Sequence, residues 1–167
     1  MHDSQAFLAL FEQLERLQSD YLIADSGYKT PSIAKFLLDQ NITPVFSYTR
    51  PRGKKGKLSP KDFIYEEYYD CYLCPENHVL AYSTTNRDGY REYKSDPKIC
   101  ANCPLLSSYT ESKKKQKILT RHIWRDYLEI CEEIRHQKGS KELYQKRKES
   151  VERLFGTAKE YHNLRYT

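Results

Sequence analysis

The spacing of apolar residues changes twice along the 167-residue chain. The first 49 residues alternate between helical and strand-like spacing. A helix is predicted from a cap at Asp3 or Ser4 to about residue 19. Its apolar stripe consists of Phe7, Leu10, Phe11, Leu14 and Leu17. A buried strand at Tyr21–Ala24, a helix opening at Pro31 and a strand over residues 42–48 follow. Helix, strand, helix and strand with short links predict an α/β layer with parallel strands.

Residues 50–116 have a different character. A basic stretch rich in Gly and Pro, residues 50–62, predicts an exposed loop, and Tyr-rich runs to about Thr110 predict antiparallel strands. Residues 117–167 are assigned to C-terminal helices, with helical spacing from about His122. A Lys-Gly-Ser break at 138–140 precedes a final helix ending near Tyr161. Aromatic residues make up 13% of the chain, including 15 tyrosines, so it is expected to fold although 31% is charged. The predicted fold is an α/β core interrupted by a small β-rich insertion.

Two C-x₂-C pairs lie in the insertion, Cys71 with Cys74 and Cys100 with Cys103. A two-residue spacer lets both thiolates of a pair face one tetrahedral ion, and two pairs complete a four-sulfur site. A proline follows each pair, which suits a turn that leaves such a site. The pattern predicts structural zinc in a zinc-ribbon-like insertion, without an open position for catalysis.

Other interpretations of the cysteines stay open. The pairs could be unrelated buried thiols, or one could be a redox motif, although two pairs within one β-rich segment favour zinc. His78, close to the first pair, is a further candidate ligand. Cys131 falls on the apolar face of a predicted helix and is expected in the core as a small apolar residue.

Asp25 directly follows the predicted strand Tyr21–Ala24. Open α/β sheets place their ligand crevice at the carboxyl ends of parallel strands, so Asp25 is a candidate for catalysis and metal binding. The Ser-Gly pair after it also fits an aspartate that only forms a turn. Both interpretations stay open from this residue alone.

Glu152 is the second candidate acid, on the final helix. The predicted buried arc of that helix consists of Val151, Leu154, Phe155, Ala158 and Tyr161. Lys148, Glu152 and Lys159 fall along one edge of the arc. The alternative is a solvated charged face with ordinary pairing between residues four apart.

Together the two carboxylates and their lysines suit phosphoryl transfer. Clustered acids hold two Mg²⁺ ions about 3.5–4 Å apart, which activate a water or 3′-hydroxyl and stabilise the leaving oxygen of a phosphodiester. Lysines beside them neutralise flanking phosphates. Two acids are few for such a site, which usually has a third.

These motifs resemble the DDE transposases of bacterial insertion sequences, in the 1182-like group. The resemblance covers nearly the whole chain and rests on YLIADSGYKT, the CYLC and CANC pairs, YSTTNRDGYREYKSDPKICANCPLL and KESVERLFGTAKEYHNLR. It implies a ribonuclease-H-like core, DNA strand cleavage and transfer dependent on Mg²⁺ or Mn²⁺, and binding to terminal inverted repeats. By position, Asp25 matches the second acid of the triad and Glu152 the third. Lys159 matches the family's lysine after the glutamate, and Lys148 stands where a related signature usually has Arg.

The resemblance also implies that parts are missing. The family's first acid lies on a strand upstream of the helix that opens this chain, and Asp3 fits a helix cap better. The N-terminal DNA-binding region is also expected to be absent, and the chain to stop before the family's usual end. The chain therefore resembles the second half of a transposase, and we expect it to be inactive alone.

The charge distribution gives a competing hypothesis. The net charge is +5, and the basic loop with Arg50, Arg52, Lys54, Lys55 and Lys57 is expected to track phosphates, together with Lys148. Tyr68 and its neighbours would offer stacking faces, or simply pack in the sheet. The alternatives are therefore a zinc-ribbon nucleic-acid-binding module and an accessory protein that regulates a full-length transposase. A homo-oligomer is a further expectation. No apolar run is long enough for a membrane span and no signal peptide is evident, so a cytoplasmic location is expected.

Overall fold

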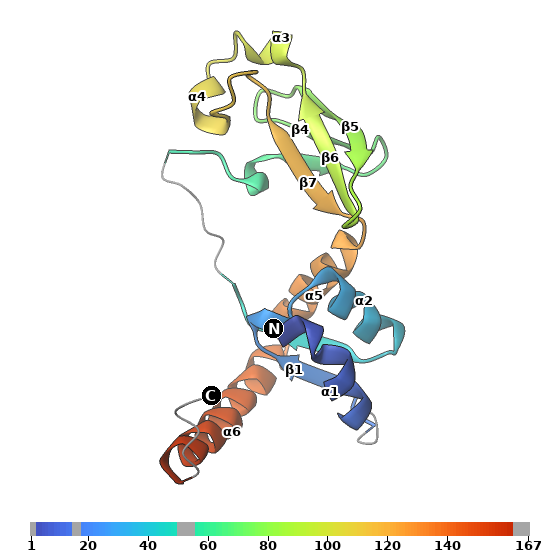
Figure 1. Cartoon of the computed structure of the whole chain (residues 1–167), viewed down its shortest axis with the longest axis vertical. Helices are drawn as coiled ribbons and strands as arrows, with labels where there is room; N and C mark the ends of the chain where they lie inside the picture. The colour runs from blue at the N-terminus through green and yellow to red at the C-terminus, as the bar shows by residue number, and fades with distance from the viewer. Residues whose placement is uncertain (1–2, 15–17, 50–55, 162–167) are drawn as a thin grey trace. The chain divides into compact units, whose positions relative to one another are not determined.

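The computed structural model describes residues 3–14, 18–49 and 56–161. The chain divides into two compact units (Figure 1). Unit 1 combines residues 1–49 with residues 124–167, and unit 2 consists of residues 50–123. None of the described helices is long and apolar enough to cross a membrane.

Unit 1 begins with the predicted alternation of helices and strands. After the 3₁₀ turn η1 (Asp3–Gln5) come α1 (Phe7–Leu14), β1 (Tyr21–Ala24), the turn η3 (Ser26–Tyr28), α2 (Pro31–Asp39) and β2 (Thr43–Phe46). The two strands pair in parallel, from Tyr21 opposite Thr43 to Ala24 opposite Phe46. The prediction of a parallel α/β layer is confirmed for this part of the chain.

Local signals fix the boundaries of α2. The Thr30 hydroxyl accepts a hydrogen bond from the Ile33 amide at 3.3 Å, and Pro31 occupies the first helical position, where no backbone donor is needed. Past the other end of the helix, Asn41 adopts the left-handed conformation with φ of 58°, which turns the chain toward β2.

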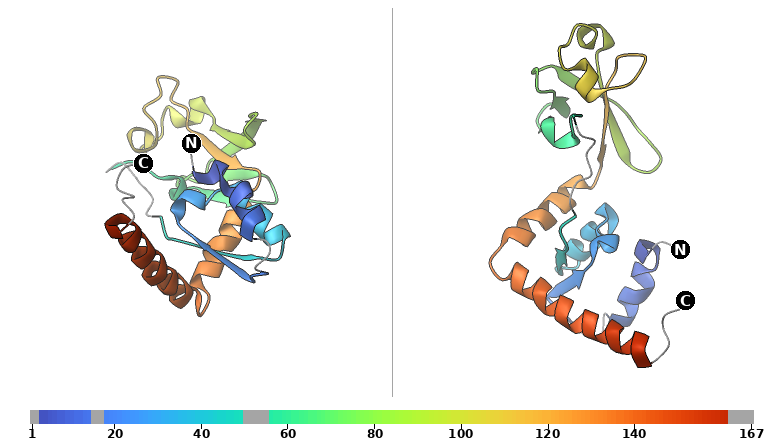
Figure 2. Two further views of the ribbon diagram at one scale, coloured as in Figure 1. Left: turned by 60° about the horizontal axis from the view of Figure 1, so that its bottom comes forward. Right: turned by 90° about the vertical axis from the view of Figure 1, so that its left-hand side faces the viewer.

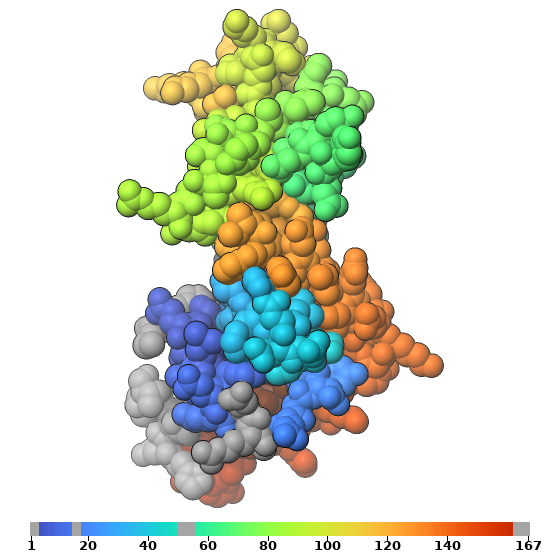
Figure 3. All heavy atoms as spheres, turned by 90° about the vertical axis from the view of Figure 1, so that its right-hand side faces the viewer, coloured from blue at the N-terminus to red at the C-terminus, as the bar shows by residue number. Residues whose placement is uncertain are grey.

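The C-terminal helices α5 (Arg125–His136) and α6 (Ser140–Tyr161) complete unit 1. α5 packs against α2 and β2, and atoms of α2 and α5 are adjacent in Figure 3. Gly139, with φ of 94°, separates the two helices as the Lys-Gly-Ser break predicted. α6 is one unbroken helix that contacts α5 and both strands (Figure 2).

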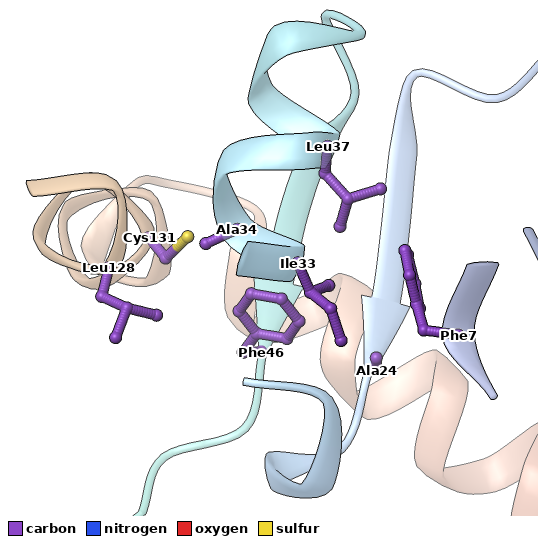
Figure 4. Close-up of a cluster of buried hydrophobic side chains, with 8 residues drawn as sticks. All are labelled: Phe7, Ala24, Ile33, Ala34, Leu37, Phe46, Leu128 and Cys131. Atoms are coloured by element: carbon purple, nitrogen blue, oxygen red, sulfur yellow. The ribbon is translucent and has the colours of Figure 1, made fainter. Parts of the chain in front are cut away.

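One buried cluster joins the two parts of unit 1 (Figure 4). It consists of Phe7, Ala24, Ile33, Ala34, Leu37, Phe46, Leu128 and Cys131. Cys131 is 2% exposed, and burial raises the pKa of its thiol to about 11, so the prediction of a core residue is confirmed. Of the predicted α1 stripe, Leu10 and Leu14 are exposed and Leu17 lies outside the described residues.

The predicted buried arc of α6 is wrong. Leu154, Phe155 and Tyr161 are 73%, 60% and 78% exposed, and only Val151 and Ala158 of that set are half-buried. Burial is concentrated in the first half of the helix, so its second half presents apolar side chains to solvent.

Unit 2 is a five-stranded antiparallel sheet whose strands follow one another in chain order. They are β3 (Ile64–Glu66), β4 (Cys71–Leu73), β5 (Val79–Thr85), β6 (Tyr90–Ser95) and β7 (Ile118–His122). The turn η4 (Pro60–Asp62) precedes β3, and two four-residue helices, α3 (Pro97–Cys100) and α4 (Leu106–Tyr109), lie between β6 and β7. Residues 118–122, grouped from sequence with the C-terminal helices, instead pair with β6, because they alternate buried and exposed side chains.

The core of unit 2 is small and contains tyrosine. Phe63, Leu80, Tyr93 and Leu119 form its buried cluster. Tyr93 is fully buried and donates a hydrogen bond to Asp70 at 2.6 Å, while Tyr65 donates to the same carboxylate oxygen at 2.8 Å. These hydrogen bonds lower the pKa of Asp70, and burial together with the bond to Asp70 raises that of Tyr93. Several tyrosines are therefore structural, as the packing interpretation predicted.

Candidate carboxylate site and cysteine cavity

Asp25 follows β1 and forms the turn that its sequence context predicted. Its side chain is half-buried, and Oδ1 accepts a hydrogen bond from the Gly27 amide at 2.9 Å, which caps η3. Within the described part of the chain this is the only hydrogen bond of the Asp25 carboxylate. Oδ2 is therefore free to accept another partner, so the turn and a ligand role are compatible in one residue.

Glu152 lies in the exposed second half of α6. Lys148 and Lys159 are also exposed, and at 100° per residue the three side chains fall within 40° of one another around the helix axis. Among the described residues no ion pair joins Glu152 to a lysine or arginine. The three side chains therefore lie on a solvated face, as the alternative interpretation predicts, although the i,i+4 ion pair of that interpretation is not formed.

Packing places the helix of Glu152 beside the strand that leads to Asp25. α6 contacts both β1 and β2, and Figure 1 shows α6 and β1 in the same part of the unit. In the part of the chain that the structure describes, however, no three acids, histidines or cysteines are grouped closely enough to hold a metal ion. Asp25 and Glu152 therefore do not form a complete carboxylate centre.

A further acid, Glu132, was not among the sequence candidates and is bound to the turn that follows β1. Lys29, four residues after Asp25, forms an ion pair with Glu132 of α5, and Glu132 also accepts a hydrogen bond from Arg135 at 2.9 Å. Burial alone would raise the pKa of Glu132, but the two cations outweigh burial and hold it below its ordinary value. Both of its carboxylate oxygens are engaged, so Glu132 fits a structural role better than a ligand role.

The four cysteines do not share one environment. Cys71 and Leu73 on β4 face the same hollow of the sheet, whereas Tyr72 between them and Cys74 after them pack toward the unit 2 core. Alternate residues of a strand point to opposite faces, and this alternation separates Cys71 from Cys74. Burial, with help from the carboxylates of Glu66 and Asp70, also raises the pKa of the Cys71 thiol. Among the described residues the four cysteines are therefore not grouped as a metal site, and the four-thiolate zinc site stays a prediction.

The other three thiols border one small cavity. Cys74, Cys100 and Cys103 line it together with Tyr109 and His78. The side chains come from the turn after β4 and from the segment between β6 and β7. His78 is exposed at the rim of the cavity. Sequence reasoning identified these cysteines but missed Tyr109, whose position depends on the fold of the second segment.

The residues predicted to contact DNA differ in their environments. Arg50, Arg52, Lys54 and Lys55 lie outside the described residues. The ammonium of Lys57 binds the Ser107 carbonyl at 2.7 Å and the Glu111 carboxylate at 3.0 Å, so it is held within unit 2. Lys148 is exposed on α6, and its contact with DNA phosphates stays a prediction.

One of the comparisons with known proteins found a match. The family model of the transposase DDE domain matches residues 73–167, more than half of the chain. The chain therefore belongs to the transposase DDE domain family. The match includes Glu152 and Lys159, while Asp25 lies before it. No curated protein and no solved structure matches the chain.

Proposed function

We propose that this chain forms part of the catalytic domain of an insertion-sequence transposase of the 1182-like group. In this proposal unit 1 is part of a ribonuclease-H-like core, and Asp25 and Glu152 are two of its three metal-binding acids. The observation that carries the proposal is the packing of α6, within the matched region, against β1, the strand that Asp25 directly follows. Divalent Mg²⁺ or Mn²⁺, when bound, would activate the attacking hydroxyl and stabilise the leaving oxygen.

The roles of the side chains follow from their exposure. Asp25 keeps Oδ2 available while Gly27 orients Oδ1, and Glu152 is accessible on the helix surface. Lys148 and Lys159 flank Glu152 on the same face, where their charges would neutralise DNA phosphates beside the scissile bond. The DNA partner in this proposal is the terminal inverted repeat of the element, and the reaction would take place in the cytoplasm.

We further propose that unit 1 needs a partner segment to become active. Among the described residues β1 pairs only with β2, so one edge of a parallel sheet is open, although such sheets are normally buried. Tyr21 on β1 and Leu8 on α1 are 51% and 57% exposed. An added strand along β1 would cover this edge and could carry the third acid. Its source would be a full-length transposase.

A nicking assay tests this proposal. Plasmid DNA with the inverted repeats that flank the gene is incubated with the chain and Mg²⁺ or Mn²⁺. We expect no nicking by the chain alone, and nicking once a polypeptide with the preceding strands and acid is added. Asp25→Asn and Glu152→Gln should each abolish the restored activity. Robust nicking by the chain alone that disappears in Asp25→Ala would overturn the proposed inactivity.

The second candidate function is nucleic-acid binding without catalysis. The observation in its favour is that residues 50–123 form a compact unit of their own, with exposed Tyr68 and Tyr69 and with exposed lysines at 113–115. Such a module, or a regulator that occupies the DNA of a full-length transposase, would bind DNA with a steep salt dependence but never cleave it. DNA binding that persists when Glu152 and Asp25 are both replaced, with no rescue of nicking by any added segment, would favour this function.

A further inference from the structure

Three thiols and a phenol border one small cavity in unit 2. A role for this cavity does not depend on the proposed function. Cys74, Cys100 and Cys103 line it, and its volume of about 20 Å³ holds roughly one water-sized particle. The hydroxyl of Tyr109 is buried there and has no hydrogen-bond partner among the described residues. A buried hydroxyl without a partner costs free energy, so its position next to three thiols requires an explanation.

The turn that carries Cys74 already has the form of a metal knuckle. The Cys74 amide donates to the His78 carbonyl at 3.0 Å, and the His78 amide donates back to the Cys74 sulfur at 3.3 Å. Asn77 takes the left-handed conformation, with φ of 57°, that this tight turn needs. Amide-to-sulfur hydrogen bonds of this kind orient a cysteine sulfur within a tight turn, which is the local geometry that a metal knuckle needs.

We propose that Cys74, Cys100 and Cys103 bind one thiophilic divalent cation of the zinc type, with the Tyr109 hydroxyl at the fourth position. Three sulfurs and one oxygen give the four donors of a tetrahedral site. The side chains are not yet grouped at ion-binding distance in the described part of the chain, so binding requires rotation of the thiols into the cavity. Cys71, on the other face of β4, takes no part.

Such an ion would stabilise residues 96–117, the segment of unit 2 with the least regular secondary structure. Residues 96–117 contain only the short helices α3 and α4. A hydrogen bond of 2.7 Å from the Leu58 amide to the Ser108 carbonyl and one of 2.9 Å from the Lys117 ammonium to the Tyr109 carbonyl help to fix this segment. The buried cluster of the unit has only four residues, and small cores of this kind commonly need a metal or disulfide. The ion would tie the segment to the turn after β4.

Metal content and cobalt absorption of the full chain test the proposal. We expect one zinc per chain and, after exchange with Co²⁺, the absorption of a tetrahedral site with three thiolates. Cys74→Ser, Cys100→Ser and Cys103→Ser should each remove stoichiometric binding. Cys71→Ser and Cys131→Ser are matched controls and should keep it. A chain that binds no stoichiometric metal contradicts the proposal, and so does a loss in Cys71→Ser equal to that in Cys74→Ser.

Two further measurements separate ligand loss from misfolding and identify the fourth donor. In the unsubstituted chain, a chelator should speed alkylation of Cys74 and Cys103, read by mass spectrometry, and equal rates with and without chelator would contradict the proposal. Tyr109→Phe should keep the sulfur-to-cobalt charge-transfer bands but weaken affinity and shift the d–d bands. Unchanged d–d bands in Tyr109→Phe, with a shift in His78→Gln, would overturn the assignment of Tyr109.

Discussion

Lys29 and Glu132 form an ion pair across 103 residues of sequence. The pair joins the turn after β1 to α5, so the C-terminal helices are fastened at the same end of the strand at which Asp25 lies. The side chain of Lys29 is only 15% exposed, which distinguishes this pair from an ordinary surface contact. The insertion of unit 2 therefore does not prevent the two ends of the chain from forming one unit.

Removal of Lys29 should destabilise unit 1. Lys29→Met leaves Glu132 paired with Arg135 alone. We expect a loss of about 1–2 kcal/mol in the free energy of unfolding, a value between those typical of exposed and of buried ion pairs. The matched control is Arg125→Gln, which breaks the half-exposed pair with Glu129 and should cost less than about 0.5 kcal/mol. Urea unfolding followed by circular dichroism measures both. Equal effects of the two substitutions would argue against a special role for Lys29.

The same pair predicts the sign of a pH dependence. The folded-state pKa of Glu132 is below its ordinary value of 4.5, so its contribution is complete above that pH and is lost as pH falls through the folded-state pKa. Lys29→Met should flatten this acid limb, because the pKa of Glu132 then moves back toward its ordinary value. Thermal unfolding over a pH series compares the two proteins, and an acid limb of unchanged steepness would contradict the prediction.

Asp70 should contribute to the stability of unit 2. Asp70→Ala leaves the buried Tyr93 hydroxyl without its acceptor, and we expect a loss of about 1–3 kcal/mol in the free energy of unfolding. Glu67→Ala, an exposed acid three residues earlier, should change it by less than about 0.5 kcal/mol. Because the folded-state pKa of Asp70 is lowered, its stabilisation is also lost as pH falls below the ordinary value of 3.8. Chemical unfolding monitored by tyrosine fluorescence measures both variants. A loss in Asp70→Ala no larger than that in Glu67→Ala would contradict the prediction.

The two lysines predicted to contact DNA should behave differently. Lys148→Gln removes an exposed charge beside Glu152 and should reduce the slope of log affinity against log salt by about 1. Lys57→Gln should leave that slope unchanged, because Lys57 is bound to Ser107 and Glu111, and should instead destabilise unit 2. Fluorescence anisotropy with labelled DNA over a salt series measures the slopes. The opposite ranking of the two lysines would show that the basic loop forms the DNA contact.

Local sequence signals predicted the elements of unit 1 that depend on a few neighbouring residues. Thr30 and Pro31 give the start of α2, and the Ser-Gly pair after Asp25 gives the turn that the structure contains. The buried face of α6 could not be predicted in this way, because the helix continues past the residues that pack against it. Its periodicity is regular, yet Leu154 and Phe155 are exposed.

The cysteines show why spacing alone did not predict their different environments. A C-x₂-C pair points both sulfurs at one ion only when the spacer forms a turn. Cys71 begins a strand instead, and an odd number of steps along a strand leaves Cys74 on the opposite face. Cys100 and Cys103 lie where the chain does turn, with the Cys103 amide donating to the Cys100 carbonyl at 3.1 Å. Tyr109 carries no sequence signal of its own, since its burial depends on the whole segment.

Mapping of the carboxylate site with ferrous iron tests the central claim most directly. Fe²⁺ bound in place of Mg²⁺ generates hydroxyl radicals with peroxide and cuts the nearby backbone, so no catalysis is required. We expect cuts close to both Asp25 and Glu152, suppressed by excess Mg²⁺ and lost at both positions in Asp25→Asn. Cuts near only one of the two residues, or cuts near Glu152 that persist in Asp25→Asn, would contradict a shared site.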